Sequence, residues 1–142
     1  MKKKVIVAVW WVLVAVCMGV IFILSSQSGE TSQTVSDEVK IFLGIPVDIH
    51  YIRKAAHFLE FAGLAFLVFN ALRQTCSRNR PVLSFLITSA YAVTDEIHQL
   101  FVEGRACRIF DVFVDSCGAA SAILFMMLLF LILEKGRLYD RK

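Results

Sequence analysis

The sequence predicts an all-α membrane protein with four transmembrane helices. Hydrophobic residues make up 58% of its 142 residues, and its mean hydropathy is +0.69, whereas apolar residues make up about half of a typical soluble domain. Four apolar stretches are each long enough for a helix to cross a bilayer, which takes about 20 residues. Lys and Arg gather in short runs that border these stretches, as is typical of membrane proteins.

The first predicted span covers residues 5–24, an uncharged run that follows Lys2, Lys3 and Lys4. A cleaved signal peptide is the alternative interpretation. Its apolar region would hold about 7 to 15 residues and would end at an A-x-A site. The longer run and the lack of that site favour a retained helix. Three further spans are predicted at about residues 55–72, 82–102 and 109–133, which gives a single transmembrane domain over residues 1–142.

The long connection between the first two spans is predicted to hold a short amphipathic helix on the extracytoplasmic membrane surface. Thr34 with Asp37 resembles a capping box at its start, and Gly44 followed by Pro46 marks its end. Apolar residues recur at helical spacing between these signals, namely Val35, Val39, Phe42 and Leu43.

The distribution of basic residues predicts that both termini are cytoplasmic, an N-in, C-in orientation. Ten of the 15 Lys and Arg then lie inside: Lys2, Lys3, Lys4, Arg73, Arg78, Arg80, Lys135, Arg137, Arg141 and Lys142. The other five lie outside. The side with more Lys and Arg in its short loops is normally cytoplasmic.

Polar residues concentrate at the predicted outer end of the bundle. Counted outward from Arg73 at 1.5 Å per residue, a core of about 30 Å places Arg53 at the outer boundary and His57 and Glu60 below it. Residues three and four apart share a helical face. We therefore expect these three side chains and Leu64 to face the interior of the bundle.

Other segments bring polar groups to the same end. The apolar part of the third span covers only about 20 Å before its carboxylates begin. The residues are Asp95, Glu96, His98 and Gln99 in the third span, Asp111 and Asp115 in the fourth, Ser26 and Gln27 after the first, and Arg105 in the last loop. Ionisable groups inside a membrane are costly and indicate a functional site.

Four motifs follow one another along the chain: SSQSG after the first span, RKAAHFLEF at 53–61, YAVTDEIHQLFVEGR at 91–105 and DVFVDSCG at 111–118. In this order they resemble the VanZ family over nearly the whole chain. Phe61 departs from the family, which often has Tyr at this position. The resemblance implies a multi-pass protein of the bacterial plasma membrane that is linked to resistance to glycopeptide antibiotics, teicoplanin in particular.

The polar cluster predicts a membrane enzyme that acts at the outer leaflet on a lipid-linked anionic substrate. Histidines and carboxylates exchange protons in such sites, and the candidate catalytic residues are His57, Glu60, Asp95, Glu96 and His98. Arginines bind phosphate, and the candidate substrate-binding residues are Arg53, Lys54, Gln99, Arg105, Asp111, Asp115, Ser26 and Gln27. The expected partners are membrane lipids, a lipid-linked cell-wall precursor or a glycopeptide.

Two other functions remain open. The same residues fit a protein that binds a lipid or the antibiotic without chemistry, and they also fit a polar network that only holds the helices together. No metal ligands are assigned and the cofactor is unknown, although a His and a Glu three residues apart on a helix also fit a divalent metal. The basic runs are short and terminal, which excludes nucleic-acid binding.

Overall fold

The computed structural model describes residues 2–44, 48–75 and 79–139. Within these residues the chain forms five α-helices and no strand, as predicted: α1 (Lys2–Ser25), α2 (Gly29–Leu43), α3 (Ile49–Thr75), α4 (Arg80–Gln99) and α5 (Ile109–Tyr139). Pro46, Arg78, Arg141 and Lys142, which entered the predictions above, lie outside the described residues.

Three of the described helices are long and apolar enough to cross a membrane. These spans are Lys2–Ser25, His50–Thr75 and Ile109–Glu134, and they correspond to the first, second and fourth predicted spans. Their outward surfaces are rich in exposed large apolar side chains, such as Val5 and Val9 on α1 and Leu128 on α5. The third predicted span, α4, is not among them because polar side chains lower its hydropathy.

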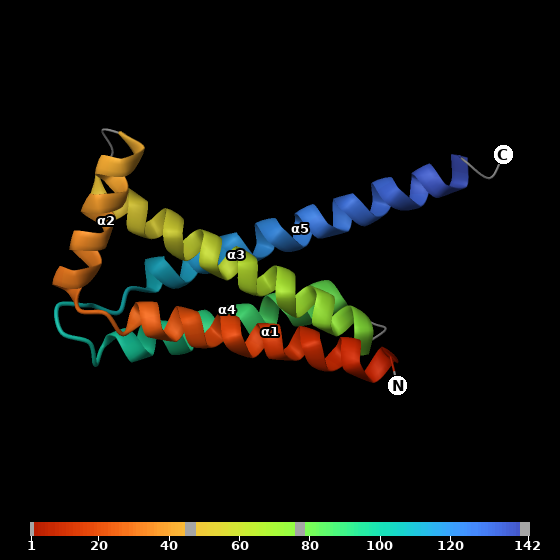
Figure 1. Ribbon diagram of the computed structural model, residues 1–142, viewed down its shortest axis with the longest axis horizontal. Coiled ribbons are helices and arrows are strands. Elements are labelled where there is room, and N and C mark those ends of the chain that lie inside the picture. The colour runs from red at the N-terminus through yellow and green to blue at the C-terminus, as the bar shows by residue number, and fades with distance from the viewer. Residues whose placement is uncertain (1, 45–47, 76–78, 140–142) are drawn as a thin grey trace.

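Helix α3 lies at the centre of the molecule and packs against each of the other four helices. Figure 1 shows α1, α3 and α4 running together, with α2 lying across one end. Both chain ends lie toward the opposite end. The first half of α5 packs on α3, and its second half diverges from the bundle. The end of the molecule at α2, called the α2 end below, also holds the loop between α4 and α5.

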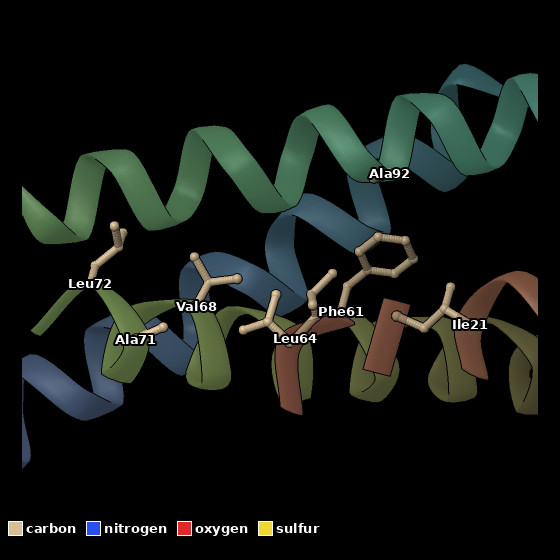
Figure 2. Packing of buried hydrophobic residues seen from close by; sticks show 8 residues of the cluster. Ile21, Phe61, Leu64, Val68, Ala71, Leu72 and Ala92 are labelled. Carbon is tan, nitrogen blue, oxygen red and sulfur yellow. The ribbon is translucent and has the colours of Figure 1, made fainter. Parts of the chain in front are cut away.

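The apolar core is built around one face of α3. Phe61, Leu64 and Val68 are fully buried and follow one another at three- and four-residue spacing. Figure 2 shows the ring of Phe61 pointing toward Ala92 of α4, with Ile21 of α1 close by. The prediction that Leu64 faces the interior is confirmed.

Helices α3 and α5 come closest at Gly118. A methyl group at this position would overlap the carbonyl oxygen of Phe58. Because glycine has no Cβ, the two backbones approach as closely as small residues allow at helix contacts in membranes. This contact places Asp115, nearly one turn before Gly118, beside α3 near His57.

The start of α2 differs from the prediction. The helix begins at Gly29, where the Ser28 hydroxyl accepts a hydrogen bond from the backbone NH of Thr31 (3.3 Å). Thr34 lies inside the helix and donates to the carbonyl of Glu30, so the predicted capping box of Thr34 and Asp37 is wrong. The predicted end is confirmed, because Gly44 adopts φ +63° as a left-handed cap.

A contact between two loops explains the early start of α2. The backbone NH of Gly29 donates to the carbonyl of Glu103 (3.0 Å), and a Cβ at Gly29 would overlap the backbone of Gly104. The turn after α1 is therefore fixed against the loop after α4, which local sequence signals do not report. Helix α3 also begins earlier than expected, at Ile49 instead of about residue 55, and α4 ends at Gln99 instead of 102.

Candidate functional site

Two hollows lie next to each other at the α2 end. The first, here called the polar cavity, has a volume of about 110 Å³ and is lined by His50, Arg53, Lys54, His57, Gln99, Gly104, Arg105, Ala106, Arg108, Asp111, Val114 and Asp115. The second, here called the α2 groove, has a volume of about 180 Å³ and is lined by Leu24, Ser25, Gln27, Ser32, Val35, Ser36, Val39, Ile52, Arg53, Ala56, His57, Glu60 and Arg105. Arg53, His57 and Arg105 line both.

The two hollows differ in character. Charged and polar side chains from α3, α5 and the loop after α4 dominate the walls of the polar cavity. Most of the surface exposed in the α2 groove is apolar, although polar side chains also line it. The apolar lining comes from Leu24, Val35, Val39, Ile52 and Ala56. The three shared residues thus form the boundary between a polar and an apolar compartment.

His57 lies between two carboxylates. Its Nδ1 is 3.9 Å from Oδ1 of Asp115 and 4.0 Å from Oε2 of Glu60. These distances are too long for hydrogen bonds, but catalytic hydrogen bonds are often this long without substrate and shorten only in the complex. The imidazole therefore occupies a position where it can accept or release a proton at the boundary between the two compartments.

Arg105 connects the loop after α4 to the end of α1. Its Nε donates to the carbonyl of Gln27 (3.2 Å), and Nη2 lies 3.5 Å from the carbonyl of Leu24. A cation at a helix C-terminus compensates the negative end of the helix dipole. Burial, followed by the neighbouring guanidinium of Arg53, lowers the pKa of Arg105 below its usual value. An arginine remains protonated despite such a shift, so this position carries a fixed positive charge.

Asp95 holds α1 to α4 from a buried position. Its Oδ2 accepts hydrogen bonds from the hydroxyl of Ser25 (2.8 Å) and from Nε2 of Gln99 (3.0 Å). One helix turn deeper, the Tyr91 hydroxyl donates to the carbonyl of Met18 (2.6 Å). These contacts attach α4 to α1. The hydroxyl of Tyr91 is already engaged in a hydrogen bond, so it is not free to bind a ligand.

Glu96 organises the loop before α5. Its Oε2 accepts a hydrogen bond from the backbone NH of Arg108 (2.7 Å), and the side chain is fully buried. Glu96 itself lines neither the polar cavity nor the α2 groove. Through Arg108 it fixes a loop whose two arginines, Arg105 and Arg108, do line the polar cavity.

Lys54 and Asp111 form an ion pair in the wall of the polar cavity. The distance between Nζ and Oδ1 is 3.1 Å, and the ammonium group lies 4.1 Å above the ring of Phe110. Both side chains remain partly exposed to the cavity. The cation of Lys54 is thus already engaged, which leaves the arginines as the main anion-binding groups.

His98 contacts α1 and the residue after it, and it lines neither hollow. Its ring stacks on Phe22 with a centroid distance of 4.2 Å, and its Nε2 is 3.0 Å from the hydroxyl of Ser26. Neither His98 nor Ser26 lines either hollow. The two predicted histidines therefore face different surroundings, and only His57 borders both compartments.

The structure brings together most, but not all, of the predicted site. The polar cavity collects Arg53, Lys54, His57, Gln99, Arg105, Asp111 and Asp115. Glu60 and Gln27 lie in the α2 groove. Asp95 and Glu96 line neither hollow and instead hold the neighbouring helices and loop in place. His50 and Arg108 also line the polar cavity, although no role was predicted for them from the sequence. His50 could have been found from its spacing, since it precedes Arg53 by three residues and His57 by seven on the same face of a longer α3.

Among the described residues, no group of three His, Cys, Asp or Glu side chains has the arrangement of a metal site. His57, Glu60 and Asp115 come near one another, but a metal requires donor atoms about 2.0 to 2.2 Å from a common point.

An apolar helical bundle with a polar site at one end defines a helical membrane protein. The VanZ/LLP1 family model matches residues 10–132, and the chain belongs to this family, as its motifs predicted. No curated protein and no solved structure is significantly similar to the chain.

Proposed function

We propose that this protein binds an anionic, phosphate-bearing lipid at the outer leaflet of the bacterial plasma membrane. The observation that carries the proposal is that Arg53, His57 and Arg105 line both the polar cavity and the α2 groove. A lipid phosphate lies at the junction between a polar head group and an apolar chain. The phosphate would occupy this boundary, the head group the polar cavity, and the chain the α2 groove.

Charge supports this placement. Arginine guanidinium groups match phosphate oxygens in geometry and charge. Among the described residues, no hydrogen bond or ion pair from Arg53 to another group occupies its guanidinium, and Arg105 has one buried nitrogen, Nη1, without a hydrogen-bond partner there. A buried donor that lacks a partner costs about 1 to 3 kcal/mol, and a bound phosphate would remove this cost.

The proposed topology has four transmembrane helices with both termini in the cytoplasm. Helix α4 is the span that apolarity alone does not identify, and its buried polar residues are compatible with a position inside the bundle. The chain ends and the α2 end lie at opposite ends of the molecule (Figure 1), so an N-in, C-in chain would expose the polar cavity to the outside. That location fits a role in cell-envelope lipid metabolism and in tolerance of glycopeptides such as teicoplanin.

A membrane enzyme is the second candidate, and the position of His57 favours it. A histidine between two carboxylates is a typical general acid or base. In this version Glu60 and Asp115 would orient the imidazole, and the arginines would hold the phosphate while a bond in the head group is made or broken. The lipid site is common to both versions, so lipid binding is tested first.

The test is to extract wild-type and variant protein in mild detergent and to measure retained phospholipids by mass spectrometry. We expect Arg53→Gln to retain at least fivefold less phosphate-bearing lipid than wild type. Arg73→Gln is the matched control, since it makes the same change at the other end of α3, where Arg73 lies over the ring of Phe130. Equal lipid retention by the wild type and both variants would contradict the proposal.

A further inference from the structure

The carboxylate of Asp115, in the wall of the polar cavity, lacks hydrogen-bond donors among the described residues. The residue is only 1% exposed, and neither carboxylate oxygen accepts a hydrogen bond from the described residues. Nδ1 of His57 lies 3.9 Å from Oδ1 of Asp115, which is beyond hydrogen-bonding distance. A buried carboxylate without donors is strongly disfavoured, so this side chain requires either a proton of its own or a donor from outside the protein.

Several other donors around the cavity are already engaged. Lys54 pairs with Asp111, the backbone NH of Arg108 is bonded to Glu96, and Arg105 donates to the carbonyls at the end of α1. The cavity therefore contains groups that attract ligands of opposite charge. Arg53 and Arg105, where the cavity meets the α2 groove, attract an anion, and Asp115 attracts a cation or a hydrogen-bond donor.

We infer that the lipid carries a primary ammonium group close to its phosphate, as a phosphoethanolamine-type head group does, and that Asp115 binds this ammonium. The inference rests on the proposed lipid-binding function and defines its substrate class. The ammonium donates hydrogen bonds to the carboxylate of Asp115 while the phosphate remains at Arg53 and Arg105. Such a zwitterionic head group satisfies both kinds of group in the cavity at once.

The size of the cavity agrees with a small head group. Its volume of about 110 Å³ is several times the roughly 10 to 15 Å³ that one water molecule requires. An ethanolamine unit has few non-hydrogen atoms and fits a space of this order. A head group with several sugars or a peptide would have to extend beyond the cavity.

The test compares three lipids with identical acyl chains: phosphatidylethanolamine, its N-acetylated derivative and phosphatidylglycerol. Native mass spectrometry of the full-length protein measures their competition for the site. We expect wild type to prefer phosphatidylethanolamine at least tenfold over the other two. Asp115→Asn should reduce this preference to less than twofold while binding of phosphatidylglycerol persists. Glu103→Gln, the same change on an exposed loop residue, should keep the full preference.

The outcomes separate this inference from the proposed function. If all three lipids bind wild type equally and Arg53→Gln weakens them all, the phosphate site stands and the ammonium site is refuted. If Asp115→Asn keeps the preference, the ammonium binds elsewhere and the inference is also refuted. If no lipid binds, the proposed function itself fails. The wild-type comparison needs no variant, so it decides the matter even if Asp115→Asn does not fold.

Discussion

The hydroxyl of Ser25, the last residue of α1, donates a 2.8 Å hydrogen bond to the buried carboxylate of Asp95 on α4. The other partner of this carboxylate, Gln99, lies on α4 itself. The serine therefore supplies the hydrogen bond that joins the two helices at Asp95. Because Ser25 and Asp95 are buried, a water molecule cannot readily replace this donor.

We expect Ser25→Ala to lower the free energy of unfolding by about 1 kcal/mol, which is near the upper range of measured hydrogen bonds between membrane helices. Thermal unfolding in detergent measures the change. Ser121→Ala is the control, because Ser121 is exposed and donates only to the carbonyl of Cys117 within α5. A Ser25→Ala protein as stable as the Ser121→Ala protein would show that the bond contributes nothing.

The contact between Gly118 and Phe58 leads to a second prediction. Gly118→Ala should destabilise the protein by about 1 to 3 kcal/mol, the usual cost of overpacking, because the new methyl group would force α5 away from α3. Gly63→Ala adds the same methyl group on α3 where nothing lies within 4 Å. That control should be neutral, or more stable by up to about 1 kcal/mol, because alanine favours helix. Equal stability of the two variants would mean that the helices separate without cost.

Cys107 tests the proposed orientation. This residue is exposed in the loop between α4 and α5, on the side that the N-in, C-in topology places outside the cell. In a variant whose only cysteine is Cys107, a membrane-impermeant maleimide should label the protein in intact cells. A variant with Lys3→Cys as its only cysteine should react only after lysis. The reverse pattern would invert the topology and place the polar cavity at the inner leaflet.

Glu96 provides the fourth prediction, which concerns function in cells. Its carboxylate accepts a hydrogen bond from the backbone NH of Arg108, and glutamine keeps an acceptor there. In a sensitive Gram-positive host, we expect wild type to reduce teicoplanin susceptibility, Glu96→Gln to keep most of this effect, and Glu96→Ala to lose it. Membrane levels of all proteins must be equal.

Two results of that experiment would contradict these expectations. If Glu96→Gln is as inactive as Glu96→Ala at equal abundance, the charge of the carboxylate is required, and Glu96 does more than hold the loop. If wild type leaves teicoplanin and vancomycin susceptibility unchanged, the protein does not act in glycopeptide tolerance, while the lipid site remains open to its own test.

The sequence predicted best what depends on local composition. The bounds of α1 follow closely from an uninterrupted apolar run, and the end of α2 follows from Gly44. The predictions were wrong where a contact with a distant segment determines the local structure. Ser28 caps α2 because Gly29 is bonded to Glu103, 74 residues further on, and nothing near Thr34 reports that contact.

The predictions for the candidate site divide in the same way, into those that depend on one helix and those that depend on contacts between helices. Spacing placed Arg53, His57 and Glu60 on one face of α3 correctly, since that face is a property of one helix. The direction of His98 depends on how α4 is rotated against α1, where Phe22 and Ser26 receive its ring. Spacing along a helix does not determine this rotation.

The polar stripe of α4 has a consequence for how the chain enters the membrane during synthesis. Ser84, Thr88, Asp95 and Gln99 are buried along one side of this helix, and the hydroxyl of Ser84 donates to the carbonyl of Ala65 on α3 (3.1 Å). Asp95 and Glu96 lie in the last two turns of α4. Each costs less there than the about 2.5 to 3.5 kcal/mol of an Asp at the centre of a span, but together with the buried hydroxyls they make an isolated α4 partition poorly from the translocon into lipid. In the four-span topology, α4 would therefore leave the translocon together with its neighbours. The strongly apolar α5, synthesised directly after it, supplies the partitioning energy for a hairpin of the two, so a ribosome that stops before α5 is complete would leave α4 uninserted.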